Sequence, residues 1–121
     1  MTELTSTMTP REIATQAAEA IRALNHLTYR GGELGSPDEV RDIIASLGLM
    51  GQGLPQLCEQ LARFLVAQQE DGQVRHGSGE DPDLSVTEVM EALNAAGQAA
   101  DMMTAALEEA HNSATELRPA R

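Results

Sequence analysis

Apolar side chains recur every three or four residues over two long stretches of this chain, and this pattern limits the possible folds more than any other feature. The first stretch contains Val40, Ile43, Leu47, Met50, Leu54, Leu57, Leu61 and Phe64. The second contains Val86, Val89, Leu93, Ala96, Ala100, Met103, Leu107, Ala110, Ala114 and Leu117. Such heptad spacing is typical of helices that bury one side against other helices. No stretch alternates as a strand does, so the sequence predicts an all-α fold.

Three capping signals predict where the helices begin. Each is a Ser or Thr followed three residues later by Glu, in the segments 9–12, 36–39 and 85–88. The first helix is expected to end at Gly31-Gly32, because glycine readily adopts the left-handed conformation of a helix C-terminus. We therefore expect helices from Pro10 to the glycine pair, over 37–70, and from Ser85 to about residue 117. The pair Asp81-Pro82 offers an earlier start for the third helix.

The expected helix over 37–70 is weakest between Gly48 and Pro55. Proline lacks the N–H that would bond to the carbonyl of Gly51, so it should kink the helix. The heptad spacing nevertheless continues through this region in phase, which a loop would have no reason to preserve. We predict one helix kinked near Pro55, with two helices separated by a break at Gly51–Pro55 as the alternative.

Composition along the chain predicts one helical domain with two irregular segments. Residues 1–8 are polar and aperiodic, so we expect them to be disordered. Residues 70–84 mix glycines with acids and should form a flexible acidic loop. The predicted domain, residues 9–118, is a short N-terminal helix packed on a long antiparallel helical hairpin, which makes a three-helix bundle.

The expected helix lengths predict a partner surface. A first helix of about 20 residues spans roughly 30 Å, whereas the two long helices of about 32 residues span nearly 50 Å. The loop end of the hairpin should therefore stay uncovered. Its apolar residues form the predicted interface: Leu57, Leu61, Phe64, Leu65, Val86, Val89, Met90 and Leu93. A second copy can cover it by forming a four-helix bundle about a two-fold axis, and a different protein fits the same surface.

The charge balance limits the classes of partner. The formal net charge is −11 at pH 7, from 19 acidic and eight basic residues. Nucleic acids and anionic membranes attract Lys and Arg, so we expect neither as a direct partner. The chain has no apolar run of about 18 residues and no secretory signal pattern. We expect a bacterial cytoplasmic protein, and its single Cys58 cannot form an internal disulfide.

Acidic residues gather around the expected loop and form a predicted acidic patch. Its members are Glu70, Asp71, Glu80, Asp81, Asp83, Glu88 and Glu91. Such a patch usually keeps a loop soluble. The functional alternative is an acidic surface that docks on a basic partner or mimics a phosphate backbone.

The candidate chemical groups predict neither a metal site nor catalysis. Glu108 and His111 have the spacing used in di-metal helical bundles, but there is one such pair and it lies beside the heptad positions. Cys58 has no electropositive setting that would activate a thiol. We predict no cofactor and no enzymatic activity. The predicted function is a non-catalytic, self-associating helical interaction module that acts as an adaptor or small regulator. The alternative is an acidic inhibitor that occupies a basic site on a partner.

Three segments carry a resemblance to other proteins. They are Asn25-His26-Leu27-Thr28, Ser36-Pro37, and Leu54-Pro55-Gln56-Leu57 with Gln60-Leu61. Together they resemble a group of short, uncharacterised helical proteins common in actinomycetes. The resemblance implies a bacterial cytoplasmic setting and brings no established activity with it.

Overall fold

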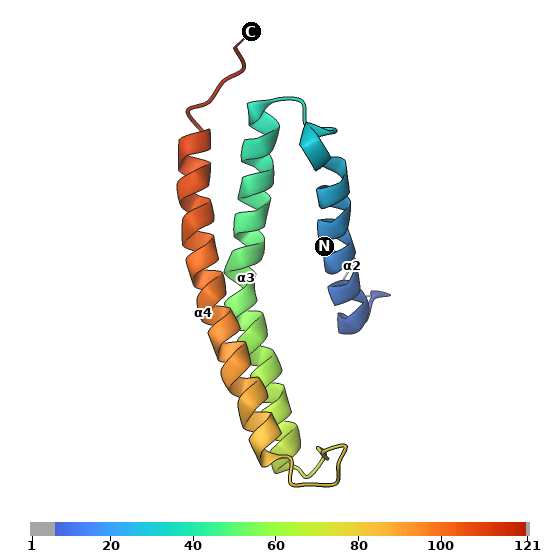
Figure 1. Cartoon of the computed structure of the whole chain (residues 1–121). Helices are drawn as coiled ribbons and strands as arrows, with labels where there is room; N and C mark the ends of the chain where they lie inside the picture. Colours follow the sequence, from blue (N-terminus) through green and yellow to red (C-terminus); the bar gives the residue numbers. More distant parts are fainter. Residues whose placement is uncertain (1–6, 121) are drawn as a thin grey trace. The chain divides into compact units, whose positions relative to one another are not determined.

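The computed structural model of this chain describes residues 7–120, and they are helical (Figure 1). Their elements are the α-helix α2 (Pro10–Leu27), the short 3-10 helix η1 (Tyr29–Gly31), and the long α-helices α3 (Pro37–Glu70) and α4 (Asp83–Ala114). No strand occurs in this part of the chain, so the predicted all-α fold is confirmed. Residues 1–6 of the segment predicted to be disordered lie outside the described residues.

The chain divides into two compact units between Ser36 and Pro37. The first contains α2 and η1, and the second contains α3 and α4. The packing of the N-terminal helix on the hairpin, and the single domain over 9–118, stay predictions.

Helix α2 begins as its capping signal predicts. The hydroxyl of Thr9 accepts a hydrogen bond from the Glu12 N–H at 3.1 Å, and the Glu12 carboxylate accepts one from the Thr9 N–H at 2.9 Å. The end of the helix differs from the prediction: α2 stops at Leu27, before the glycine pair. Arg30 and Gly31 then have φ values of 53° and 81°, so the chain is already turning there.

Helix α3 is continuous from Pro37 to Glu70 with Pro55 in its interior. The prediction of one helix is thereby confirmed, and the alternative of two helices is wrong. Figure 1 shows the axis of α3 bending along its middle third. Because proline has no N–H, its position in the helix interior removes a hydrogen bond from the preceding turn, which favours such a bend.

Helix α4 begins two residues before the predicted Ser85. The Asp81 carboxylate accepts a hydrogen bond from the Asp83 N–H at 2.9 Å, so the earlier start at Asp81-Pro82 is the correct one. The helix ends at Ala114 rather than at about residue 117. Figure 1 shows α3 and α4 side by side and antiparallel, joined by the segment 71–82, which confirms the predicted hairpin.

Small residues form the contact between the two long helices. Gly51 lies against Thr104, and Gly97 lies against Pro55. The buried residues of this unit are Gly51, Val86, Gly97, Ala100, Thr104 and Ala114. Helices whose contact residues are small can approach more closely, since the distance between helix axes depends on the side chains between them.

The heptad interpretation of this contact needs a correction of one residue. Val86, Ala100 and Ala114 are buried as the pattern predicted. However, the other buried positions of α4 are Gly97 and Thr104, one residue after the expected Ala96 and Met103. On α3 the contact likewise moves to Gly51, Pro55 and Cys58, each one residue after a heptad position. The large heptad residues of α3 from Met50 to Phe64 are consequently left exposed.

Candidate interaction faces of the hairpin

The hairpin has two distinct faces, which follow from the positions of the contact residues. Successive residues of an α-helix are rotated by about 100°. The residues that follow the contact positions therefore lie on one side of the hairpin. Five of them line a single groove between α3 and α4: Glu59, Arg63, Glu91, Gln98 and Asp101. The residues that precede the contact positions must then lie on the opposite side.

That opposite side is the apolar face. Its members are Met50, Leu54, Leu57, Leu61 and Phe64 of α3, with Val89, Ala92, Ala96, Ala99 and Met103 of α4. All of them are exposed, and among the largest exposures are Phe64 at 66%, Leu61 at 51% and Leu57 at 48%. An apolar surface of this extent on a soluble protein marks an interaction site more often than chance exposure.

Charged residues are absent from the apolar face. Within 43–69 of α3 and 89–107 of α4, the charged residues are Glu59, Arg63, Glu91 and Asp101. All four line the groove on the other side of the hairpin. Over these stretches the hairpin is therefore amphipathic, with charge on one face and none on the other.

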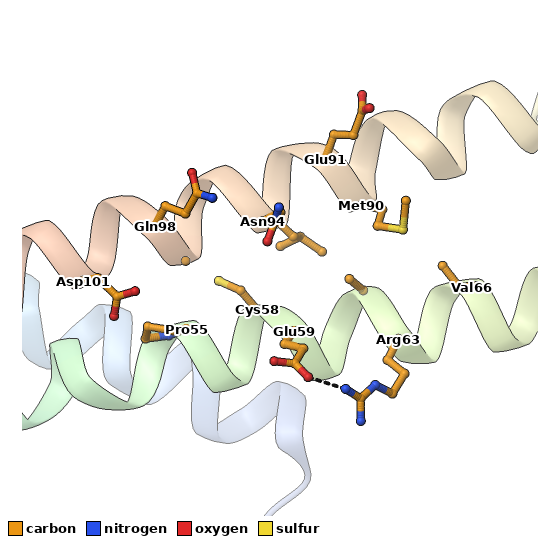
Figure 2. Close-up of a pocket in the computed structure, with 13 residues that line it drawn as sticks. Pro55, Cys58, Glu59, Arg63, Val66, Met90, Glu91, Asn94, Gln98 and Asp101 are labelled. Carbon is orange, nitrogen blue, oxygen red and sulfur yellow. Dashed lines mark hydrogen bonds and ion pairs between the residues drawn. The ribbon is translucent and has the colours of Figure 1, made fainter.

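The groove has an apolar floor between charged rims (Figure 2). Pro55, Cys58, Val66 and Met90 contribute to its floor. Figure 2 shows the Glu59–Arg63 ion pair along the α3 rim and Glu91 pointing away from α3 at the α4 rim. Arg63 is the one basic residue among the groove-lining residues.

The structure brings together half of the predicted interface residues. Leu57, Leu61, Phe64 and Val89 lie on the apolar face. Val86 is only 8% exposed, so its apolar surface is already covered within the hairpin.

The other three predicted interface residues lie elsewhere in the hairpin. Leu65 and Leu93 are half-buried, and Met90 lines the groove on the opposite side. Met50, Leu54 and Met103 belong to the face but were not assigned to the interface, although their heptad positions already distinguished them.

The seven residues of the acidic patch are all exposed. None of them forms an ion pair within residues 7–120. The loop is held by local hydrogen bonds instead. The Ser78 hydroxyl contacts His76 Nδ1 at 2.7 Å and Glu80 Oε1 at 3.0 Å, and the carboxylate of Asp83 accepts a hydrogen bond from the Gln69 side chain.

The candidate chemical groups lie apart from one another. In the described part of the chain, no group of three or more His, Cys, Asp or Glu side chains is placed to hold a metal ion. Glu108 and His111 line a second shallow groove with Leu107, and Cys58 is half-buried in the floor of the first. The absence of a cofactor and of catalysis stays a prediction.

The helices of residues 7–120 include none that is both long and apolar enough to cross a membrane.

Comparisons with protein-family models, with curated proteins and with solved structures find no match to this chain. The resemblance to short helical proteins of actinomycetes therefore stays a prediction.

Proposed function

We propose that this chain is a non-catalytic helical protein–protein interaction module, an adaptor or small regulator, that self-associates through the apolar face of its hairpin. The observation that carries the proposal is the exposure of Leu57, Leu61 and Phe64 together on a face without charge. A bacterial cytoplasmic setting, which the resemblance implies, belongs to the same proposal.

More large apolar side chains are exposed on the apolar face than are fully buried in the hairpin. The buried apolar residues are Val86, Ala100 and Ala114. Two of these are alanines, which contribute little burial. Full burial of a Leu or Phe side chain contributes roughly 1.5–3 kcal/mol. Covering the apolar face would therefore add hydrophobic stabilisation that the contact between α3 and α4 leaves unused.

Helix α2 is too short to cover the whole of α3. Helix α2 has 18 residues and α3 has 34, so their lengths are about 27 Å and about 51 Å. Even a fully apolar helix of that length could not cover all of α3. The apolar face itself is only about 21 Å long, from Met50 to Phe64, so the length of α2 does not decide whether α2 or a partner covers this face.

Light scattering after size exclusion tests this proposal on the full chain. We expect a dimer at micromolar concentration, and a monomer for the variant Leu61→Gln/Phe64→Gln. The matched control is Met102→Gln, which removes a 74% exposed apolar side chain outside the apolar face and should leave the dimer intact. The wild-type chain should also be measured at ~100 μM, a concentration at which even a weak dimer, with a Kd well below 1 mM, would form. A monomer under these conditions would refute self-association.

A second candidate function is an acidic inhibitor that occupies a basic site on a partner. The exposure of all seven acidic-patch residues, without an ion pair, supports it. Binding of poly-lysine at low ionic strength, lost near ~0.5 M salt, is the expected behaviour because screening then acts within a few ångströms. The variant Glu80→Gln/Asp81→Asn should weaken this binding without weakening the dimer. Undiminished binding by the variant would count against the inhibitor.

A further inference from the structure

The two helices contribute opposite shapes to the apolar face. Helix α3 presents Leu54, Leu57 and Leu61, which we call the leucine ridge. Helix α4 presents Ala92, Ala96 and Ala99, which we call the alanine track, and all three alanines are exposed. Between the larger residues Val89 and Met103, the α4 part of the face therefore stands out from the backbone by a single methyl group, whereas the α3 part stands out by the length of a leucine side chain.

The ridge and the track lie at the same height along the hairpin. Gly51 lies against Thr104, Gly97 against Pro55, and the Gln69 side chain bonds to Asp83. In an antiparallel pair these contacts fix which residues face each other. Interpolation between them places Leu61 level with Ala92, Leu57 level with Ala96, and Leu54 level with Ala99.

We propose that a second copy of this chain seats its leucine ridge on the alanine track, while its own track receives the ridge of the first copy. This inference depends on the proposed self-association and specifies its geometry. A two-fold axis parallel to the hairpin keeps every residue at its height. Each leucine ridge therefore lies on the alanine track of the other copy, with residues of equal height in contact. Because of the two-fold symmetry, this contact occurs twice in the interface.

The other two-fold arrangement fits the surface less well. An axis perpendicular to the hairpin, in the plane between the copies, would place leucines on leucines along one side and alanines on alanines along the other. The gap between the copies would then be uneven, and interfaces with packing as dense as protein interiors do not leave such gaps. When leucines of one copy face alanines of the other, the distance between the facing helices is the same on both sides of the interface.

The distribution of charge supports a second copy as the occupant. The four charged residues of the relevant helical stretches all line the groove on the opposite side. Two apolar faces can therefore meet without burying an unpaired charge, whose desolvation opposes association. Two copies of a chain with a net charge of −11 repel each other, so self-association is favoured on a surface without charged residues. The apolar face is such a surface.

The proposed geometry places both acidic loops at one end of the dimer. Asp71, Glu80 and Asp81 of each copy would lie near their counterparts, and their repulsion would oppose association. Salt screens such repulsion, so the dimer should become tighter between 0.05 and ~0.5 M salt. Docking of a basic partner on the same acids would respond to salt in the opposite direction.

A residue exchange tests the pairing of ridge and track. We expect Leu57→Ala and Ala96→Leu each to weaken the dimer about tenfold or more, a change that corresponds to 1.4 kcal/mol. The double variant Leu57→Ala/Ala96→Leu should regain most of the affinity, because the leucine of one copy then meets the alanine of the other. Ala105→Leu, an exposed position outside the apolar face, is the matched control and should not change association. A double variant as weak as Ala96→Leu overturns the proposed pairing.

Distances between spin labels provide a second readout. With Cys58→Ala as background, a label at Gln73 in the loop should report a distance of about 20 Å for the axis parallel to the hairpin, because neighbouring helices pack with closely spaced axes. The perpendicular axis would place the two loops at opposite ends of the dimer. The labels would then be about 40 Å or more apart, twice the length of helix between the leucine ridge and the loop. A dimer with the longer distance would overturn this geometry while leaving self-association intact, whereas a monomer would refute the proposed function itself.

Discussion

Gly51 of α3 lies so close to Thr104 of α4 that a β-carbon on residue 51 would come within 2.4 Å of the threonine Oγ1. This approach is possible only because residue 51 has no side chain. It places the backbone of α3 directly beside the side chains of α4. The larger apolar residues next to Gly51 are thereby turned to the outside, where they make up the apolar face.

Gly51→Ala should destabilise the hairpin. The added methyl group would overlap Thr104, and overpacking of this kind typically costs about 1–3 kcal/mol. The helix propensity of alanine offsets part of this loss, by about 0.5–1 kcal/mol. We expect a net decrease in the free energy of unfolding of about 1–2 kcal/mol, measured by thermal or urea denaturation followed by circular dichroism.

Two further variants distinguish overlap from a general effect of alanine. A β-carbon on Gly53 would meet no atom within 4 Å, so Gly53→Ala should stabilise α3 by about 0.5–1 kcal/mol. Thr104→Ala removes the Oγ1 that Gly51→Ala would strike, so the double variant should recover most of the lost stability. Additive losses in the double variant would show that the two residues are not coupled.

Gly97 should tolerate alanine but not a large side chain. A β-carbon there would lie 3.5 Å from Pro55 Cα, which is an ordinary van der Waals distance. We expect Gly97→Ala to change the free energy of unfolding by less than about 1 kcal/mol, and Gly97→Leu to reduce it by about 2 kcal/mol or more through overpacking. Equal effects of the two substitutions in urea denaturation would contradict the close packing of the helices here.

Pro55→Ala should stabilise α3. Proline in a helix interior costs about 3 kcal/mol relative to alanine, and its replacement restores a backbone hydrogen bond in the preceding turn. Loss of the proline ring against Gly97 reduces the gain, so we expect about 1–2 kcal/mol and a higher Tm. An unchanged or lower Tm would show that the ring contributes more to the hairpin than its missing N–H costs.

The capping box of α2 should make the stability of that helix depend on pH. Hydrogen bonds from the Thr9 backbone, and then from its side chain, hold the pKa of the exposed Glu12 carboxyl below its ordinary value. A depressed folded-state pKa stabilises the helix above the unfolded-state pKa, and this stabilisation disappears as the pH falls through the folded value. We expect α2 to lose helicity on acidification, and NMR titration should place the Glu12 midpoint lower than in Thr9→Ala.

Glu12→Gln provides the control for this pH dependence. Glutamine can occupy the same capping position but does not titrate. The part of the acid-induced loss that comes from Glu12 should therefore disappear in this variant. A Glu12 midpoint that is the same with and without the Thr9 side chain would contradict the contribution of the threonine hydroxyl.

The sequence alone determined the features that depend on neighbouring residues. Thr9 and Glu12 are three positions apart, so their capping box could be predicted and its atoms are found bonded as expected. The spacing of apolar residues likewise predicted two long helices, including the continuity of α3 through Pro55, because a helical period can be counted along one chain. Both possible starts of α4 could be read from the sequence, and the structure has the earlier one, at which the Asp83 N–H donates a hydrogen bond to the Asp81 carboxylate.

Only the tertiary structure decided which side of each long helix faces the other. The heptad pattern and the stripe of small residues are one position apart, and hydrophobicity by itself favours the larger side chains of the heptad. The structure instead brings Gly51, Gly97 and Thr104 inward, because small side chains let two backbones approach closely. That choice depends on atoms from two helices at once, and no pattern within one helix contains it.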